Sequence, residues 1–134
     1  MRPIKFRGKT TANGHWVYGS LIAYNNGACA IRNSKSEPWV DPSTVGQFTG
    51  LRDCTGKEIY EGDILERYNE HGITMHINYF GSQFGCVQHW DGVGNEGSWY
   101  PLDNYFMEQW EVIGNIHDNP ELLNTESNTN NTRQ

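Results

Sequence analysis

The densest group of side chains that could do chemistry is Glu58, Glu61 and Asp63, three carboxylates within six residues. Paired carboxylates can act as general acid and general base in a hydrolase. The same residues also fit a structural role, because Asp63 follows a glycine in a turn, where a carboxylate accepts hydrogen bonds from backbone N–H groups. We favour the structural role and expect no catalytic residues here. An unrecognised hydrolase is the remotest of the functional hypotheses.

The cysteines and histidines show no metal or nucleophile pattern. The three cysteines are an odd number at wide spacing, so they predict no disulfide framework. Only Cys86-x-x-His89 has the short spacing of a zinc-ligand pair, and residues three apart on a strand point to opposite faces. Cys54 and Cys86 lack a local signature of thiol activation. The sequence therefore predicts no metal, no cofactor and no catalytic cysteine.

The basic residues are concentrated at one end of the chain. Residues 1–35 carry six bases and no acid, a formal charge of +6, whereas residues 36–134 carry four bases and sixteen acids, a formal charge of −12. The six bases are Arg2, Lys5, Arg7, Lys9, Arg32 and Lys35. Such asymmetry concerns partners or assembly rather than fold. The basic segment could meet acidic surface of its own chain, a neighbouring subunit or a phosphate backbone.

The first of these bases lie in an alternating segment. Alternation predicts that Ile4 and Phe6 face a core, while Lys5, Arg7 and Lys9 share the opposite face of one strand. A solvated strand face is the simpler interpretation. The functional hypothesis is that these three cations contact phosphates or an acidic protein surface.

Three aromatic residues complete the candidate site. Trp16 and Tyr18 lie on the next predicted strand and are available to stack on bases. Trp39 lies in residues 33–43, which contain two prolines and no periodicity and are predicted to be a connection. It is a candidate surface aromatic, and the alternative is a lid over one end of the core. The candidate partner-binding residues are Lys5, Arg7, Lys9, Trp16, Tyr18 and Trp39.

The elements that must position these residues are strands. Thirteen per cent aromatic residues and fifteen glycines in 134 residues favour an all-β fold. The Asn-Gly pair at residues 13–14 and the turn at residues 25–27 divide the first third into a β-meander. Residues 45–65 read as a tightly turned ribbon, with a hairpin turn at residues 53–56. Residues 73–79 alternate as a half-buried strand.

Later segments are less regular. Residues 91–98 are predicted to be a glycine-rich hairpin tip, and their two acids and the lack of a predicted helix after them argue against phosphate binding. Apolar spacing in residues 102–110 predicts a short helix, and Asn119-Pro120-Glu121 predicts a helical turn through Leu123. Residues 124–134 have no apolar side chain and are expected to be disordered.

The central ribbon carries a family resemblance. Residues 44–51, Asp53 and residues 56–64 resemble the signature of the YopX family, as do Lys5-Phe6-Arg7-Gly8 near the start and residues 112–117 and 119–123 near the end. Residues 69–111 depart from that pattern. The resemblance implies a small, mainly β protein with an SH3-type barrel, encoded by phages and prophages, of unassigned molecular function.

These observations give one expected organisation. We expect a mainly β chain, with an SH3-type barrel, an additional N-terminal β-meander and one or two short helical turns. Residues 1–123 would be a single YopX-like domain and residues 124–134 a polar tail. No apolar run approaches the ~20 residues of a membrane span, and the N-terminus lacks a signal-peptide core, so we expect a cytoplasmic protein without membrane contact.

Two functional hypotheses follow from the charges. The first is a phage or prophage accessory protein that acts as a non-catalytic oligomeric binding module, with a host or phage protein as a further partner. The alternative is a nucleic-acid-binding protein that uses the basic N-terminal hairpin. The acidic remainder of the chain would repel a second pass of nucleic-acid backbone.

Overall fold

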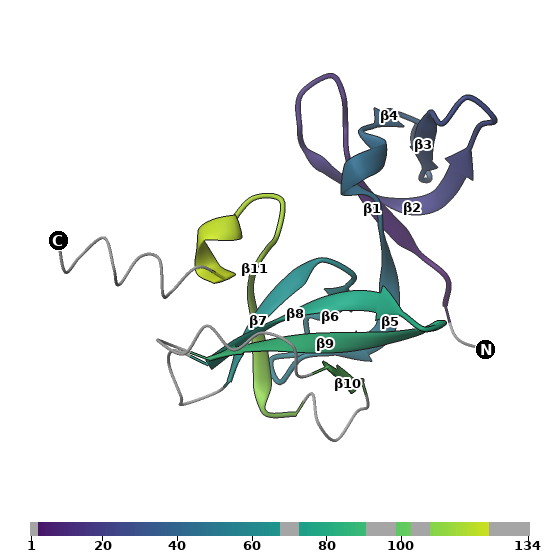
Figure 1. Ribbon diagram of the computed structural model, residues 1–134. Helices are drawn as coiled ribbons and strands as arrows, with labels where there is room; N and C mark the ends of the chain where they lie inside the picture. Colours follow the sequence, from purple (N-terminus) through teal and green to yellow (C-terminus); the bar gives the residue numbers. More distant parts are fainter. Residues whose placement is uncertain (1–2, 68–72, 91–98, 103–107, 124–134) are drawn as a thin grey trace, which may run out of the picture. The chain divides into compact units, whose positions relative to one another are not determined.

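A computed structural model describes residues 3–67, 73–90, 99–102 and 108–123 (Figure 1). These residues form two antiparallel sheets and two short 3-10 turns, so the mainly β prediction is confirmed. The chain divides into two compact units, an N-terminal unit of residues 1–50 and a C-terminal unit of residues 51–134. The sheets are open in strand order, and the SH3-type barrel stays a prediction. The single-domain assignment also stays a prediction.

The N-terminal unit contains the predicted meander. Its elements are β1 (Phe6–Lys9), β2 (Trp16–Ala23), β3 (Cys29–Arg32), β4 (Trp39–Val40), the 3-10 turn η1 (Pro42–Thr44) and the start of β5 (Gly46–Arg52). The strand order is β4-β3-β2-β1-β5, and the sheet continues to β6 (Glu58–Tyr60) beside the end of β5. An isolated antiparallel bridge from Thr10 to Val40 also joins the end of β1 to β4. Gly8 lies where β1 passes Val40, and a Cβ added there would lie 3.1 Å from the valine side chain, which would have to shift by a few tenths of an ångström.

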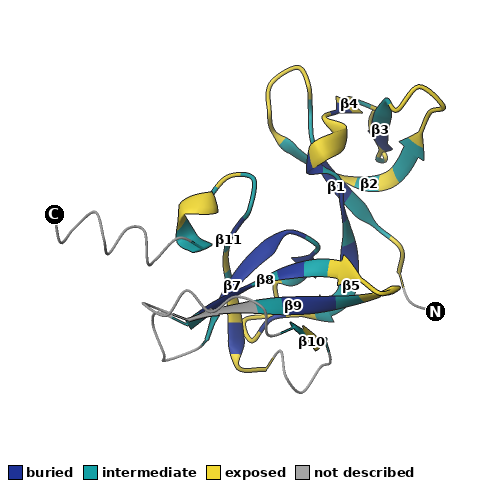
Figure 2. Ribbon diagram, viewed as in Figure 1, coloured by how far each residue is buried: buried dark blue, intermediate teal, exposed yellow. Residues whose placement is uncertain are grey.

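The C-terminal unit holds the second sheet. Its strands are β7 (Asp63–Arg67), β8 (Ile73–Phe80), β9 (Gln83–Trp90), β10 (Trp99–Pro101) and β11 (Trp110–Asn115), in the order β10-β9-β8-β7-β11. The 3-10 turn η2 (Pro120–Leu123) follows, which confirms the predicted terminal helical turn. Buried positions, where the ribbon is dark blue in Figure 2, recur along these strands. Buried apolar side chains of this unit, including one from β6, pack in one cluster. The members are Ile59, Leu65, Met75, Ile77, Cys86 and Trp110.

The predicted turn at residues 53–56 forms and is anchored by its acid. Asp53 Oδ1 accepts hydrogen bonds from the N–H groups of Thr55 and Lys57 at 2.8 and 2.9 Å. Its Oδ2 accepts from the Val112 N–H at 2.8 Å, which ties the turn to β11. A carboxylate in such a turn replaces backbone partners that the chain reversal removes. One side chain therefore links residues far apart in the sequence.

Several local predictions need correction or fall outside the described residues. Residues 33–43 are not only a connection, because they contain β4 and η1. Ile4 does not face a core, since 66% of its surface is exposed. The helix predicted over 102–110 is wrong at Trp110, which begins β11, and residues 103–107 lie outside the described residues. The loop 91–98 and the tail 124–134 also lie outside them. Among the described residues no helix is long and apolar enough to cross a membrane.

Candidate binding face of the N-terminal unit

Pairing of β1 with β2 brings four of the predicted site residues together. Arg7 lies directly opposite Tyr18, and Lys9 lies directly opposite Trp16. Cross-strand partners share a face of the sheet, as do residues two apart on one strand. The two cations and the two aromatic rings therefore lie on one face of the hairpin. This confirms that Arg7 and Lys9 share a face, and Lys5 has the same parity.

The cations contact aromatic rings on that face. The Arg7 guanidinium carbon lies 4.6 Å from the centre of the Trp16 ring, and Lys9 Nζ lies 5.7 Å from it. Lys5 Nζ lies 5.5 Å from the centre of the Phe48 ring. A cation above an aromatic ring is attracted to its negative face, by about 0.5–1 kcal/mol where the pair is exposed and ~2 kcal/mol where it is desolvated. Arg7 is only 6% exposed, so it holds Trp16 in position rather than presenting charge to a partner.

The same face continues onto β3 and β4. Ser20 and Ile22 of β2 alternate with Tyr18 and lie opposite Arg32 and Ala30. Ala30 in turn lies opposite Trp39 of β4. We name this surface the basic–aromatic face, made of Arg7, Lys9, Trp16, Tyr18, Arg32 and Trp39.

Two of its aromatic residues are open to solvent. Trp39 is 53% and Tyr18 is 45% exposed, so Trp39 is a surface aromatic rather than a lid. The Trp39 ring lies 5.3 Å from that of Tyr24, at an interplanar angle of 47°. Tyr24 is also exposed. Exposed rings held by each other are typical of binding surfaces, because they offer contact area at low conformational cost.

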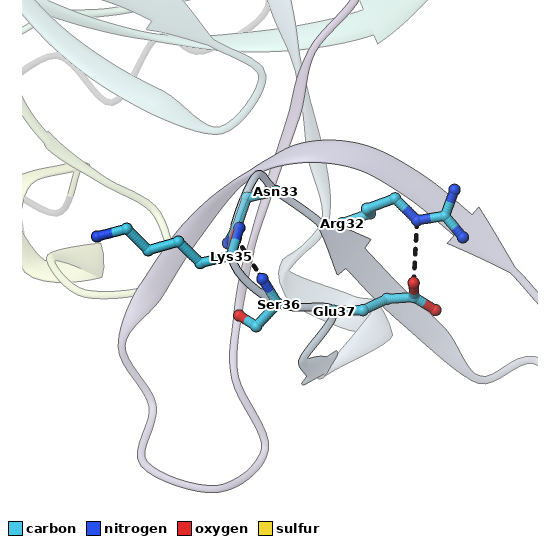
Figure 3. Close-up of polar contacts among 5 residues, drawn as sticks. All are labelled: Arg32, Asn33, Lys35, Ser36 and Glu37. Atoms are coloured by element: carbon cyan, nitrogen blue, oxygen red, sulfur yellow. Dashed lines mark hydrogen bonds and ion pairs between the residues drawn. The ribbon is translucent and has the colours of Figure 1, made fainter.

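The end of the face is fixed by the turn between β3 and β4. Arg32 Nε lies 2.9 Å from Glu37 Oε1, and both side chains are largely exposed (Figure 3). Asn33 Oδ1 accepts hydrogen bonds from the N–H groups of Lys35 and Ser36 at 2.8 and 2.9 Å. The Asn side chain therefore shapes the turn that sets Arg32 beside Glu37.

A polar groove borders the face at Lys9. It has a volume of about 440 Å³ and is lined by Lys9, Thr10, Thr11, Gly14, Asp41, Pro42 and Thr44. Asp41 Oδ1 is already engaged, since it accepts the Ser43 N–H at 3.0 Å and the Ser43 hydroxyl at 2.9 Å. The groove therefore presents the cationic side chain of Lys9 beside Asp41, whose carboxylate caps η1.

Two of the three candidate catalytic carboxylates, Asp63 and Glu58, have structural contacts. Asp63 Oδ2 accepts the Tyr60 N–H at 2.7 Å, as its turn position predicts. Glu58 Oε1 accepts the Tyr60 hydroxyl at 3.0 Å, and Glu58 Oε2 lies 3.5 Å from Arg52. Groups of three or more potential metal ligands are absent from the part of the chain that the structure describes. These contacts support the structural role of the acids.

The thiols are poor nucleophiles in their surroundings. Burial raises the pKa of Cys86 to about 12, so its thiolate is scarce at neutral pH. The pKa of the exposed Cys54 is also raised, by partial desolvation and then by the negative charges of Asp53 and Glu111.

Sequence reasoning missed two members of this region. Tyr24 was not among the candidates, although it directly precedes the turn at residues 25–27, and it becomes visible only as the partner of Trp39. Arg32 was counted for charge but not placed on the face. Its position depends on the register of β2 with β3, which alternation within one strand cannot supply.

Comparison with known proteins is consistent with this architecture. The family model described as YopX protein matches residues 5–124. The crystal structure of protein EF1440 from Enterococcus faecalis is similar, with a TM-score of 0.53 and 25% sequence identity over 92% of this chain and 99% of that chain. No curated protein matches the chain. Because the family model covers most of its length, the chain belongs to the YopX family.

Proposed function

We propose that this protein is a non-catalytic binding module that assembles with copies of itself. The observation that carries the proposal is the opposite charge of the two units. Residues 1–50 contain six bases and two acids, a formal charge of +4, whereas residues 51–134 contain four bases and fourteen acids, a formal charge of −10. A basic unit of one copy and an acidic unit of another attract each other. Electrostatic complementarity of this kind steers association and fixes orientation.

In this proposal the basic–aromatic face is the surface of the basic unit that binds the second copy. Its half-buried Lys9 and its exposed Arg32 lie on one side of the sheet with the rings of Tyr18 and Trp39. Aromatic residues and Arg are enriched in protein interfaces relative to the remaining surface. Both a reciprocal dimer and a head-to-tail ring satisfy the charge pattern. The family likeness supports an accessory role for a phage or prophage, acting in the cytoplasm of the host cell.

Nucleic acid is the competing partner for the same face. Its cations suit phosphates and its exposed rings suit base stacking. The charge of −10 on the C-terminal unit opposes close approach of a long polyanion. We therefore place a second copy first, and nucleic acid is an alternative outcome of the same experiment.

Light scattering of the full chain at low and high salt tests the proposal. We expect an oligomer at low salt that dissociates as salt screens the contact, because the Debye length falls from about 30 Å at 0.01 M to about 3 Å at 1 M. Lys9→Glu should weaken the oligomer, whereas Lys57→Glu, which makes the same charge change on the C-terminal unit, should not. A gel-shift assay on the same proteins covers the alternative.

The outcomes separate the partners. An oligomer weakened by salt and by Lys9→Glu supports self-assembly. A monomer that shifts DNA or RNA, and loses the shift with Lys9→Glu, points to nucleic acid. A monomer without nucleic-acid affinity at low salt overturns both proposals.

A further inference from the structure

An exposed aromatic surface of the C-terminal unit lies at the tip of the β8–β9 hairpin. Tyr79 lies directly opposite Phe84, and Tyr100 of β10 lies directly opposite Cys86. Phe84 and Cys86 are two residues apart on one strand, so all three rings share one face of the sheet. Cys86 belongs to the buried cluster, which therefore lies on this same face. We name Tyr79, Phe84 and Tyr100 the tyrosine face.

The tyrosine face is uncharged and is open to solvent at its two tyrosines. Tyr79 is 54% and Tyr100 is 41% exposed, while Phe84 is half-buried. The rings of Tyr79 and Phe84 lie 5.1 Å apart in a T-shaped arrangement. Strands β8, β9 and β10 contain no Asp, Glu, Lys or Arg, although their unit has fourteen acids. Clustered exposed rings mark interaction sites, whereas single exposed apolar side chains are normal.

The opposite face of the same strands is occupied in part by a tryptophan of its own. Phe80 and Trp99 lie on that face, because each is next in its strand to a residue of the tyrosine face. The Trp99 ring lies over Gly85, where an added Cβ would be 2.2 Å from it. Trp99 Nε1 donates a hydrogen bond to Asn78 Oδ1 at 2.9 Å. This ring is therefore engaged with its own sheet, and the tyrosine face is the better surface for a partner.

The hairpin backbone fixes which rings share the tyrosine face. Phe80 and Gln83 pair across a two-residue turn, Gly81-Ser82, in which both residues have positive φ. This geometry is that of a type I′ turn, which matches the twist of the two strands. A shift of one residue in this register would move Tyr79 to the opposite face. Because the turn holds the rings in place, they lose little further entropy on binding.

We infer that the tyrosine face is the docking surface for the basic–aromatic face of a second copy. The inference rests on the proposed function and names the surface of the C-terminal unit to which the partner binds. Interface cores are poor in charged residues and rich in aromatic residues. The tyrosine face has this composition within an acidic unit, and the basic–aromatic face presents exposed Tyr18 and Trp39 within a basic unit. The exposed Arg32 side chain also suits the negative faces of the tyrosine rings.

Charge selects this occupant over two others. Pairing of the tyrosine face with the same face of another copy would bring together two units of formal charge −10. A nucleic acid would meet the same repulsion. The N-terminal unit of another copy, with a formal charge of +4 and exposed rings of its own, is attracted instead.

Light scattering of full-length variants at low salt tests the docking surface. Tyr79→Ser should weaken self-association by about tenfold or more, because it removes an aromatic residue from the interface core. Phe80→Ser is the matched control, since Phe80 is the next residue of the same strand and is 66% exposed but lies on the opposite face. This control should leave association unchanged. Unchanged association of a folded Tyr79→Ser variant, or an equal loss with Phe80→Ser, overturns the inference.

A second variant on another strand makes the test independent of β8. Tyr100→Ser should also weaken self-association, because Tyr100 belongs to the tyrosine face but lies on β10. Circular dichroism and thermal melts establish that each variant is folded. If Tyr79→Ser unfolds the chain, Tyr100→Ser decides the test, and unchanged association of that variant overturns the inference.

A mixture of two defective variants identifies the occupant. Trp39→Ser damages the basic–aromatic face and leaves the tyrosine face intact, whereas Tyr79→Ser does the reverse. In an equimolar mixture the intact face of one variant meets the intact face of the other. We expect the mixture to associate more strongly than either variant alone at the same total concentration. A mixture that associates no better than its stronger component would mean that the two faces do not bind each other, which overturns the inference.

The outcomes also separate this inference from the proposed function. An oligomer weakened by Lys9→Glu but not by the tyrosine-face variants overturns only the present inference. Wild-type protein that is monomeric at low salt overturns the proposed function as well.

Discussion

Both units of this chain are built from antiparallel strands, but different side-chain contacts stabilise each unit. In the C-terminal unit six of the buried apolar residues form one cluster drawn from β6, β7, β8, β9 and β11. In the N-terminal unit the fully buried aliphatic side chains are few, chiefly Ile31 and Val40, and the meander is completed by cations on rings and by a glycine at a close strand contact. A small unit with little apolar volume leaves its aromatic residues at the surface. The exposed rings of the basic–aromatic face are side chains that this unit does not bury.

Matched isoleucine truncations should show the largest difference between the units. Ile77 and Ile31 are both completely buried, one in each unit. Ile77→Ala should lower the free energy of unfolding by about 2–5 kcal/mol, since it leaves a cavity in a continuous cluster. Ile31→Ala should cost less, because Ile31 lies outside that cluster. Urea unfolding of both variants measures the difference, and equal losses would break the comparison.

A glycine substitution tests the close contact between β9 and the Trp99 ring in the C-terminal unit. Gly85→Ala would place a Cβ 2.2 Å from the Trp99 ring, so the ring must move. We expect a loss of about 1–3 kcal/mol, as for other overpacked sites. The double variant Gly85→Ala/Trp99→Ala should lose less than the sum of the two single losses, because the clash is gone. Thermal melts give both values, and additive losses would contradict the close contact.

The turn anchored by Asp53 predicts a pH dependence. Burial is the largest single influence on its pKa and raises it, but hydrogen bonds from Val112, Thr55 and Lys57 together outweigh burial and lower the pKa. The stabilisation is therefore complete above the unfolded pKa of about 3.9 and is lost as pH falls through the lower folded pKa. Asp53→Asn should cost about 1–3 kcal/mol near neutral pH. Its unfolding free energy should also change less than that of the wild type on acidification, and parallel curves would contradict this assignment.

The smallest effect on stability should come from the exposed ion pair of the N-terminal unit, Arg32 with Glu37. Arg32 and Glu37 are largely exposed, with side-chain accessibilities of 63% and 42%. Exposed pairs of this kind contribute about 0.2–1 kcal/mol or less. Arg32→Ala should therefore leave the melting temperature almost unchanged, while it weakens any oligomer that uses the basic–aromatic face. A large loss of stability would show that the N-terminal unit depends on this pair more than on its buried residues.

The strand content, the turn at Asp53, the structural role of Asp63 and the family could all be predicted from the sequence. Each of these depends on residues close together in the chain, where alternation, glycine and a capping carboxylate act through local geometry. The parity of Lys5, Arg7 and Lys9 was predictable for the same reason.

Tertiary structure decided which strands meet and therefore which side chains become neighbours. Arg7 was predicted to be a partner-binding cation, yet packing against Trp16 leaves it 6% exposed. Trp39 joined Tyr24 because β3 pairs with β4, and Trp99 covered Gly85 because β9 pairs with β10. Register between strands is set by burial of whole faces, and a shift of one residue would reverse every side chain. The local sequence sets the period of a strand but not its partner strand, and the basic–aromatic face depends on which strands pair.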